Sequence, residues 1–493
     1  MKTRHRVFKW LMVIALLAGL TQAVSPTVVS GQDLDDEKGC TTVIVGKEAS
    51  ADGSVLMAHT EDYGANDAMK LVYHPRQTHE PGEVIHFAFE DVPQVPETYA
   101  YTSDDMYDPE RLGIPPAVFL DGINEWGVSA TSNCITSRIP KLPQDNTKGL
   151  GWPEIAQLVM ERATTAREAV DLATSLVDQY TFNGFEATSC KELTFLIADP
   201  NEGWAIDVLR NYWVALRVPD DGALYYANVC RIGSVFTMAS SNLIPDAIAN
   251  GWYDPNSGTP FSFKDTYCAG YLNSTSSVRR QARAEFLLKD KVAAHTVTVQ
   301  DLMAVQRDHY EGTPDYKIPN VPQTISNSGT QSGQIYHLRG WLPREFGPVM
   351  LITASSPDIS IFTPVYAGHS EQTPVEWRTA AVSFSPDSAW WNFEYIQRTL
   401  TPRYALTAPA PNAAFYLAYF PELRAEFDRV EQQQFHEMDQ KEQAAAGLIA
   451  QGKIDQAKHL LSMFSNSSLH QNYVNAKTEL NWLFVKGGTP GTQ

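Results

Sequence analysis

Residues 40–62 read CTTVIVGKEASADGSVLMAHTED, which is two apolar segments separated by a polar one. The β-branched run at residues 41–46 is typical of a buried strand, and residues 54–59 predict a second strand. Residues 48–53 between them are small, acidic or glycine, as turns favour. The segment therefore predicts a β-hairpin at the start of a sheet.

The turn position also predicts which residues face each other across this hairpin. If the turn is centred near Ser50, paired residues have numbers that sum to about 100, so Thr60 lies opposite Cys40. His59 and Asp62 are close neighbours of Thr60 in the sequence. We therefore expect His59, Thr60 and Asp62 to lie near Cys40.

The rest of the chain predicts a large α+β domain. Further strands are expected at residues 84–90, 117–120, 193–198, 204–209, 212–218, 223–229, 334–338, 348–353 and 359–363. The four at 193–229 are separated by Asp, Asn, Gly and Pro, which predicts an antiparallel meander. Helices are expected at residues 153–162, 165–179, 278–290 and 298–308, with Thr164 as an N-cap. The domain at residues 40–414 is then packed antiparallel sheets and helices, and residues 415–493 form a helical C-terminal extension.

The N-terminus has the pattern of a secretory signal. Residues 1–23 combine a basic start, an apolar run at residues 11–20 and small residues at the end. The apolar run is short for a membrane-spanning helix, although an uncleaved anchor is the alternative, and no later segment reaches spanning length. Residues 24–39 are polar and acidic, as in a short pro-segment. We expect an exported protein, periplasmic or extracellular.

The charge balance excludes one class of partner. The 493 residues carry a formal net charge of −19. An acidic surface repels phosphate backbones, and the basic cluster at residues 279–283 is short, so nucleic acid is not the expected partner. The sequence leaves a homo-oligomer open.

The five cysteines are an odd number for an exported chain. Export favours disulfides, so one thiol is left over or pairs between chains. No CxxC or His-rich spacing occurs, so no metal site is expected. Cys40 is the candidate for the odd thiol, because it joins the leader to the first strand. If the chain is cut between Gly39 and Cys40, the new α-amine is a base beside its own thiol nucleophile. The alternative is a disulfide at Cys40.

The meander also constrains the other four cysteines. Cys190 would begin its first strand and Cys230 would end its fourth, at the same end of the sheet. Three strand spacings of about 4.8 Å separate them, whereas bridged Cα atoms lie within about 7 Å. We therefore predict that Cys190 and Cys230 are not bonded to each other.

Several motifs follow one another along the chain. They are Cys40-Thr41-Thr42-Val43-Ile44-Val45-Gly46-Lys47, His59-Thr60-Glu61-Asp62, Gly122-Ile123-Asn124-Glu125-Trp126-Gly127-Val128, Ala227-Asn228-Val229-Cys230-Arg231, His309-Tyr310-Glu311-Gly312-Thr313-Pro314 and Pro364-Val365-Tyr366-Ala367-Gly368. Together they resemble the dipeptidase A-type cysteine peptidases of the N-terminal nucleophile hydrolases. The resemblance spans about residues 40–400. It implies a four-layer αββα sandwich of two antiparallel sheets between helices. It also implies leader removal and hydrolysis of dipeptides through a thioacyl-enzyme on Cys40, without a metal or organic cofactor.

The resemblance also implies supporting residues. Asp62 falls where related amidases place an aspartate beside the nucleophile's amine, and Asn228 where they place an oxyanion-hole amide. Arg280 resembles an active-site arginine of the penicillin V acylase and bile salt hydrolase branch, and would touch either the nucleophile or a substrate carboxylate. His59 stands where relatives often carry arginine, so it is either a partial substitute or strand packing.

Some assignments stay open at this stage. Asn133 is near another polar position of the family, but the register is ambiguous by one residue against Cys134. Arg279 is as close a candidate as Arg280, and no residue is assigned to a substrate ammonium. The alternatives to a dipeptidase are an acyl-amide hydrolase of the penicillin V acylase or bile salt hydrolase type and a non-catalytic extracellular binding protein.

Overall fold

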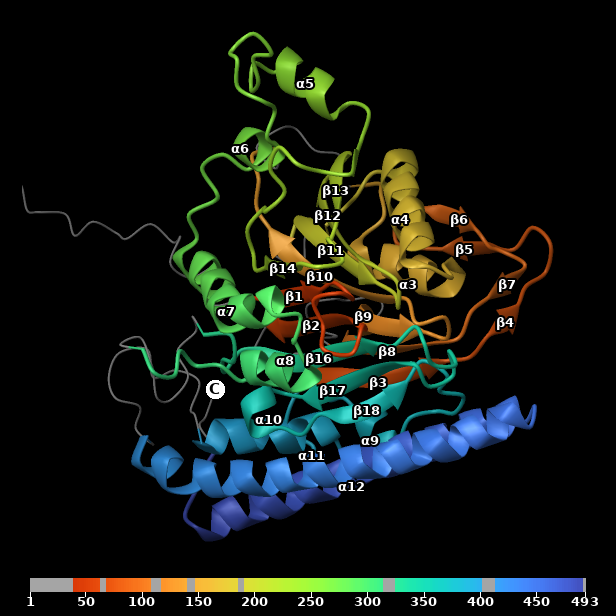
Figure 1. Cartoon of the computed structure of the whole chain (residues 1–493), viewed down its shortest axis with the longest axis vertical. Helices are drawn as coiled ribbons and strands as arrows, with labels where there is room; N and C mark the ends of the chain where they lie inside the picture. The colour runs from red at the N-terminus through yellow and green to blue at the C-terminus, as the bar shows by residue number, and fades with distance from the viewer. Residues whose placement is uncertain are drawn as a thin grey trace, which may run out of the picture. The chain divides into compact units, whose positions relative to one another are not determined.

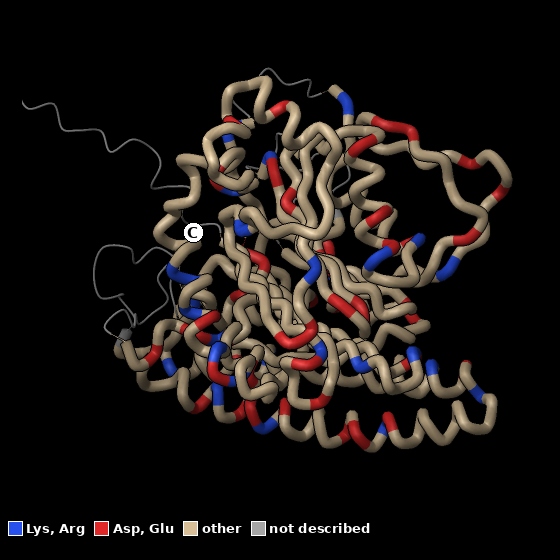
Figure 2. The backbone as a smooth tube through the Cα atoms, turned by 45° about the horizontal axis from the view of Figure 1, so that its top comes forward, with Lys and Arg blue, Asp and Glu red and all other residues tan. Residues whose placement is uncertain are grey.

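A computed structural model describes residues 39–62, 68–107, 117–139, 147–184, 190–313, 324–400 and 413–490. The expected signal peptide and residues 24–38 of the expected pro-segment lie outside these residues. Among the helices described, none combines the length and the apolar character that a membrane span requires. Figure 2 shows the basic residues distributed over the described chain and interspersed with acidic ones.

Two antiparallel sheets form the centre of the structure (Figure 1). The six-stranded sheet has the order β14 (Ala223–Tyr226), β1 (Thr41–Val45), β2 (Val55–Asp62), β16 (Thr330–Leu338), β17 (Pro348–Ala354) and β18 (Thr363–Tyr366). The eight-stranded sheet has the order β15 (Met238–Ala239), β13 (Tyr212–Arg217), β12 (Gly203–Leu209), β11 (Glu192–Ala198), β10 (Ser129–Ile135), β9 (Ala117–Asn124), β8 (Tyr101–Tyr107) and β3 (Ala68–His74). Two small ribbons pair β4 (Gln77–Thr78) with β7 (Glu97–Thr98) and β5 (Val84–His86) with β6 (Asp91–Pro93).

The described residues also form helices, several of which cover the outer faces of the two sheets. They are α3 (Trp152–Arg162), α4 (Ala166–Tyr180), α5 (Leu243–Ala249), α6 (Phe263–Tyr267), α7 (Thr275–Ala293), α8 (Val299–Gln306), the 3₁₀ helix η3 (Pro357–Ile359), α9 (Val375–Arg378), α10 (Ala389–Leu400), α11 (Ala413–Ala450) and α12 (Ile454–Val485). Helices α3 and α4 contact β9 to β13, whereas α7 and α8 contact β1, β2, β14 and β16. The result is the four-layer αββα sandwich that the resemblance implied.

The two-residue period of the strands explains the four layers. On β1, Val43 belongs to the apolar cluster that contains Leu288 of α7, whereas Ile44 belongs to the cluster that joins the two sheets. On β11, Phe195 packs in the cluster of α3 and α4, and Leu196 faces the space between the sheets. Because successive side chains point to opposite faces, strands that are apolar throughout bury both faces and require a layer on each side.

The C-terminal helices complete the outer layer over the six-stranded sheet. Met438 of α11 and Leu461 of α12 share an apolar cluster with Leu351 of β17. Arg339 and Glu442 form a buried ion pair of 2.7 Å that ties α11 to the end of β16. The predicted helical extension is therefore present, and it packs directly on the sheet.

The predicted meander is wrong in its fourth strand. β14 leaves the sheet of β11 to β13 and pairs with β1, in the register Thr42↔Tyr226. The reason is the turn before it: the backbone N–H groups of Gly46 and Glu48 donate to the carbonyls of Gly222 and Asp220, at 2.9 and 2.7 Å. This turn is therefore bound to the turn of the first hairpin, and the following strand adds to the hairpin's free edge.

The disulfides are Cys134–Cys190 and Cys230–Cys268, with Cα separations of 5.2 and 6.4 Å, and Cys40 is free. Both cysteine predictions are thus confirmed, Cys40 as the odd thiol and Cys190 as not bonded to Cys230. The argument about strand spacing was nevertheless wrong, because the strand before Cys230 lies in the other sheet.

Several local predictions differ in detail. The N-cap of α4 is Thr165, whose side chain accepts from the backbone N–H of Glu168, and not Thr164. Part of the strand expected at residues 359–363 is instead the end of η3. Strands β3 and β8 were not predicted, because their polar and apolar residues do not alternate cleanly.

Candidate active site

The first hairpin determines where the candidate nucleophile lies. β1 and β2 pair in the register Thr41↔Thr60 and Thr42↔His59, one residue away from the predicted one. This register makes Glu61 the residue across from Cys40, which immediately precedes β1. Cys40 is 2% exposed, so its thiol is inside the structure.

Arg280 on α7 holds the backbone on both sides of the candidate cleavage position. Its Nη1 donates to the carbonyl oxygens of Gly39 and Cys40, at 2.5 and 2.6 Å. The guanidinium is so close to Gly39 that a Cβ there would collide with it. Arg279 instead lies over the ring of Tyr310, 5.3 Å from its centroid. The geometry therefore favours Arg280 over Arg279, and contact with the nucleophile over contact with a distant substrate group.

The motif at residues 308–311 supports the helix that carries Arg280. Arg283, one turn further along α7, forms an ion pair with Asp308 at 2.6 Å and donates to the carbonyl of Glu311 at 3.0 Å. The Arg283 guanidinium also lies 5.8 Å from the centroid of the Tyr310 ring. These contacts fix the position of α7 against the sheet, which is a role that the sequence did not indicate for this motif.

Asp62 lies beside the nucleophile but is held by other partners. Its carboxylate accepts hydrogen bonds from Asn327 Nδ2 at 2.7 Å and Thr330 Oγ1 at 2.6 Å. Burial raises the pKa of Asp62 to about 7, although the charge of Arg280 opposes this shift. Its carboxyl group can therefore exchange a proton near neutral pH.

His59 is completely buried in a chain of hydrogen bonds. Its Nδ1 lies 2.8 Å from Thr42 Oγ1, and that hydroxyl donates to Asn133 Oδ1 at 2.6 Å. Asn133 in turn donates through Nδ2 to the carbonyl of Cys40 at 3.1 Å. Because the Thr42 hydroxyl proton is used on Asn133, Nδ1 of His59 is the donor and its Nε2 faces Glu61. The structure thus resolves the ambiguity in favour of Asn133, since Cys134 is in a disulfide.

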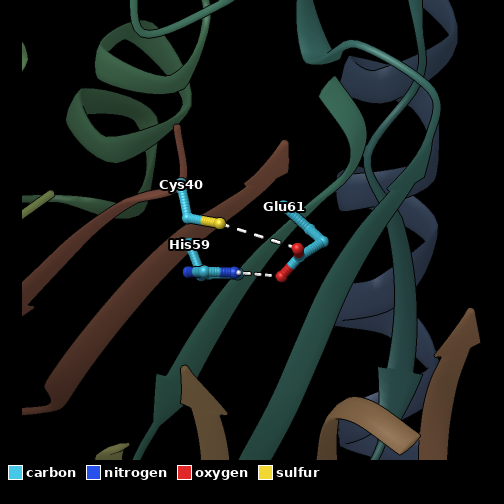
Figure 3. A group of neighbouring side chains, drawn as sticks. All are labelled: Cys40, His59 and Glu61. Carbon is cyan, nitrogen blue, oxygen red and sulfur yellow. Dashed lines mark hydrogen bonds and ion pairs between the residues drawn. The ribbon is translucent and has the colours of Figure 1, made fainter. Parts of the chain in front are cut away.

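Glu61 joins the thiol to the imidazole, and the sequence reasoning missed it. Its Oε1 accepts from Cys40 Sγ at 3.5 Å, and its Oε2 lies 3.1 Å from His59 Nε2 (Figure 3). The two-residue period of β2 could have found it, because His59 and Glu61 necessarily share a face. The ligand-type atoms of these three residues all lie within 4.8 Å of one another.

The surroundings of the thiol keep it protonated in the uncut chain. Burial raises the pKa of Cys40 well above its ordinary value, and the charges of Glu61 and Asp62 raise it further. A backbone hydrogen bond at Asp62 and the charge of Arg280 oppose these effects. Activation of the thiol therefore requires a neighbouring group that takes its proton.

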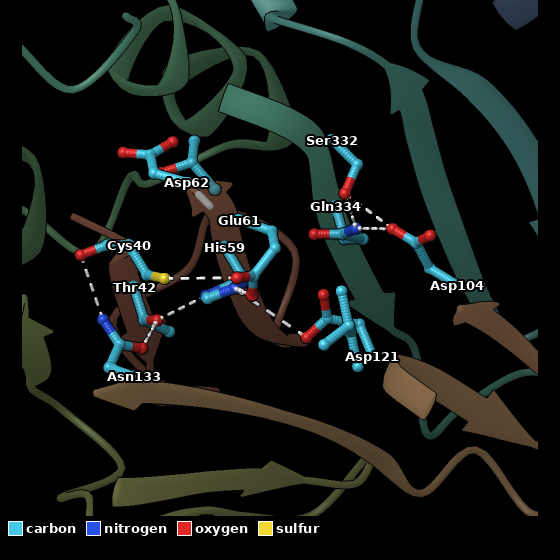
Figure 4. A network of polar contacts seen from close by, with 12 residues as sticks. Cys40, Thr42, His59, Glu61, Asp62, Asp104, Asp121, Asn133, Ser332 and Gln334 are labelled. Atoms are coloured by element: carbon cyan, nitrogen blue, oxygen red, sulfur yellow. Dashed lines mark hydrogen bonds and ion pairs between the residues drawn. The ribbon is translucent and has the colours of Figure 1, made fainter. Parts of the chain in front are cut away.

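Two further buried carboxyl groups, those of Asp121 and Asp104, lie on the side of His59 away from Cys40 (Figure 4). Asp121 Oδ1 is 3.8 Å from His59 Nε2, and no donor among the described residues meets the Asp121 oxygens in hydrogen-bonding geometry. Asp104 accepts from Ser332 Oγ at 2.6 Å and Gln334 Nε2 at 2.7 Å. Burial raises the pKa of each carboxyl group to about 8.

Asn228 reaches the site because β14 crosses between the sheets. It follows β14 by two residues and therefore lies next to the start of β1. Its Oδ1 accepts from Arg280 Nη2 at 2.9 Å. This bond orients the amide so that Nδ2 points away from Arg280. All five residues predicted for the site, Cys40, His59, Asp62, Asn228 and Arg280, are thus brought to one end of the hairpin.

Comparison with known proteins identifies the family of this chain. The model of peptidase family C69 matches residues 39–415. The chain belongs to peptidase family C69. A "Probable dipeptidase" of Salmonella dublin is 28% identical over 372 residues, covering 68% of this C69 chain and 82% of its own length. A "Probable dipeptidase B" of Lactococcus lactis is 24% identical over 390 residues, covering 71% and 79%.

Solved structures are similar to this C69 chain at low sequence identity. A variant of conjugated bile acid hydrolase from Clostridium perfringens has 10% identity and a TM-score of 0.36, covering 64% of this chain and 89% of its own. Penicillin V acylase from Agrobacterium tumefaciens has 15% identity and a TM-score of 0.35, covering 64% and 82%.

Proposed function

We propose that this C69 peptidase is an exported cysteine dipeptidase with Cys40 as its N-terminal nucleophile. The observation that carries the proposal is the setting of Cys40. It is the free cysteine among five, it immediately precedes the first strand, and Arg280, Asn133 and Glu61 all bond to it. The names of its relatives support dipeptides as the substrates.

The first step of the proposal is removal of the leader. Cys40 Sγ attacks the carbonyl carbon of Gly39, the Gly39–Cys40 bond breaks, and the former amide nitrogen takes the thiol proton. Water then hydrolyses the thioester and releases the Gly39 carboxylate. Arg280 Nη1, 2.5 Å from the Gly39 oxygen, is suited to stabilise the negative charge that develops on that oxygen.

The mature enzyme then uses its new α-amine as the base. The amine takes the proton of Sγ, and the thiolate attacks the carbonyl carbon of the dipeptide. The tetrahedral oxyanion accepts from Asn228 Nδ2, whose orientation Arg280 maintains. The amine's proton passes to the leaving amino group, the thioacyl-enzyme forms, and water activated by the same amine releases the acid.

Export is part of the same proposal. The disulfides Cys134–Cys190 and Cys230–Cys268 support an oxidising compartment, periplasmic or extracellular, because such bonds are rare in reducing cytosol. Fractionation of expressing cells tests this directly. Recovery of the mature chain with reduced cysteines in the cytosol would contradict it.

The experiment that tests the function combines N-terminal sequencing with a panel of dipeptides and acyl-amides. We expect a chain that begins at Cys40 and hydrolyses dipeptides, and a Cys40→Ala variant that retains its leader and has no activity. Faster hydrolysis of penicillin V or conjugated bile acids than of any dipeptide would favour the acyl-amide alternative. An uncut chain without activity would favour the binding protein.

A further inference from the structure

Cys40, His59 and Glu61 have the composition and spacing of a transition-metal site. Cys40 Sγ is 3.5 Å from Glu61 Oε1, and His59 Nε2 is 3.1 Å from Glu61 Oε2. Ligands of a tetrahedral zinc ion lie roughly 3.3 to 3.6 Å apart, given bond lengths of about 2.0 to 2.3 Å. The three side chains therefore need little movement to enclose one ion (Figure 3).

The hydrogen bonds around His59 prepare its Nε2 as a ligand. A metal-bound histidine normally donates its other ring N–H to a fixed partner, which determines the tautomer and the ring orientation. Here Thr42 Oγ1 is that partner at 2.8 Å, and its own proton is used on Asn133 Oδ1. The Nε2 lone pair is then directed toward Glu61 and the thiol. An imidazole that served only to pack the strand would not require this arrangement.

A second observation is a buried carboxyl group beside the site that lacks hydrogen-bond donors. Asp121 is completely buried, and among the described residues no donor satisfies its two carboxylate oxygens in hydrogen-bonding geometry. Its nearest ion-pair partner is His59 Nε2, at 3.8 Å. A cation bound to Nε2 would lie close to the Asp121 carboxyl group and would favour its ionised form.

We infer that Zn²⁺ binds this chain through Cys40 Sγ, His59 Nε2 and one oxygen of Glu61, and that bound zinc blocks the nucleophile. Binding releases the thiol proton and the proton that His59 and Glu61 share. The fourth ligand position is open to water or to the α-amine of the mature chain. The binding site follows from the geometry alone, whereas the blocking of catalysis rests on the proposed function.

The same ion cannot assist hydrolysis at this position. Zinc occupies the sulfur lone pair that attacks the substrate, so its occupancy and the reactivity of Cys40 exclude each other. Zinc therefore acts as a reversible inhibitor, and His59 is the residue that makes this chain sensitive to it.

Alkylation of the free thiol measures occupancy of this site without a contribution from other cysteines. The other four cysteines are in disulfides, so alkylation of the native protein reports on Cys40 alone. We expect one equivalent of Zn²⁺ to slow alkylation of Cys40 by iodoacetamide at least tenfold, and excess chelator to restore it. We also expect Co²⁺ to give a thiolate-to-metal charge-transfer band that Zn²⁺ removes.

Variants of the proposed ligands test which side chains bind the ion. In calorimetric titrations with Zn²⁺, His59→Gln and Glu61→Gln should each weaken binding at least tenfold. His337→Gln is the matched control, because His337 also pairs with a carboxylate, Asp52 at 2.8 Å, but has no thiol beside it. Its zinc affinity should equal that of the wild type.

The outcomes separate this inference from the proposed function. Absence of both the cobalt band and the alkylation protection in the wild-type chain, cut or uncut, would overturn the zinc site without any variant needing to fold. Unchanged zinc affinity in Cys40→Ser would place bound zinc elsewhere and would overturn it too. A chain that binds zinc here but hydrolyses no dipeptide would keep the site and reject the enzyme.

Discussion

Two buried histidines in this molecule have nearly the same neighbours but opposite electrostatics. His59 lies 3.1 Å from Glu61 and 3.8 Å from Asp121, and burial lowers its pKa below the ordinary value. His309 lies 3.0 Å from Glu311 and 3.3 Å from Asp358, and its pKa is raised to about 10 despite burial. The first imidazole is therefore neutral at pH 7, whereas the second is charged.

The partners of the two aspartates account for the difference. The hydrogen bond and the charge of His309 lower the pKa of Asp358 to about 2 despite burial, and hydrogen bonds from Ser356 Oγ at 2.6 Å and Ser326 Oγ at 3.1 Å lower it further. Burial raises the pKa of Asp121 to about 8, although the charge of His59 and the Thr131 hydroxyl oppose this shift. A carboxylate that is ionised in the interior holds the imidazolium, whereas a protonated one does not.

The comparison separates a structural cluster from a reactive one. Around His309 the charges are fixed, and the pair anchors the motif that holds α7. Around His59, a histidine, a thiol and several carboxyl groups lie close enough to exchange protons. Proton transfer and metal binding both require such groups. The predictions below test whether function and stability divide between the two clusters in this way.

The largest effect is expected from removing the thiol. Cys40→Ala should lower kcat/KM for dipeptides more than about 10³-fold, because no other group replaces the nucleophile. Asp358→Asn in the other cluster should leave kcat/KM within about threefold of wild type at temperatures where it is folded. Steady-state kinetics on both variants measures the contrast. Loss of activity in a folded Asp358→Asn variant would show that the clusters are not separate.

The second prediction reverses the contrast by measuring stability. Asp358→Asn should lower the free energy of unfolding by about 3 kcal/mol, because it leaves the buried imidazolium of His309 without its buried partner and with only the half-exposed Glu311. Cys40→Ala removes a small side chain and no charge pair, so it should cost about 1 kcal/mol. Urea unfolding of the uncut Cys40→Ala chain and of uncut Asp358→Asn in that background measures the difference. Equal stabilities would mean that His309 is neutral.

The third prediction concerns pH. The pKa of His309 is raised from 6.5 to about 10, so its stabilising contribution is complete below about pH 6.5 and is lost as the pH rises through about 10. On the acid side, the pKa of Asp358 is lowered from 3.8 to about 2, so its contribution is lost as the pH falls through that range. The stability difference between the parent chain and Asp358→Asn should therefore shrink by about 2 kcal/mol from pH ~6.5 to pH ~10. A difference independent of pH would reject the charged pair.

The sequence predicted the hairpin, but its register was one residue wrong at the site. Turn chemistry places the centre of a hairpin only to within a residue, and a shift of one residue changes which face each side chain occupies. The predicted register put Thr60 across from Cys40, whereas the observed one puts Glu61 there. Glu61 was therefore missed although its neighbours His59 and Asp62 were chosen.

The crossing of β14 could not be predicted from local patterns. The segment alternates and follows a turn, as a fourth meander strand would, and only backbone bonds between two distant turns divert it. Asn228 was assigned by family resemblance, and its proximity to Cys40 depends on this crossing. Charge states were equally inaccessible, because they depend on burial and on partners such as Asp358 that are remote in sequence from His309.

The smallest predicted effect belongs to the reactive cluster. Asp104 accepts two hydrogen bonds through Oδ2, while its buried Oδ1 has no partner among the described residues, and its pKa is raised from 3.8 to about 8. The folded state therefore binds a proton that the unfolded chain has lost, so stability falls as the pH rises toward about 8. Asp104→Asn retains an acceptor for Ser332 and Gln334 but does not ionise.

The stability of Asp104→Asn relative to wild type should therefore rise by about 1 kcal/mol between pH ~7 and pH ~8, because one bound proton contributes at most about 1.4 kcal/mol per pH unit. Urea unfolding at the two pH values measures this gain, and both chains should carry Cys40→Ala so that leader removal does not differ between them. A stability difference between the two chains that is the same at both pH values would mean that Asp104 is already ionised. The contrast with Asp358 would then rest on Asp121 alone.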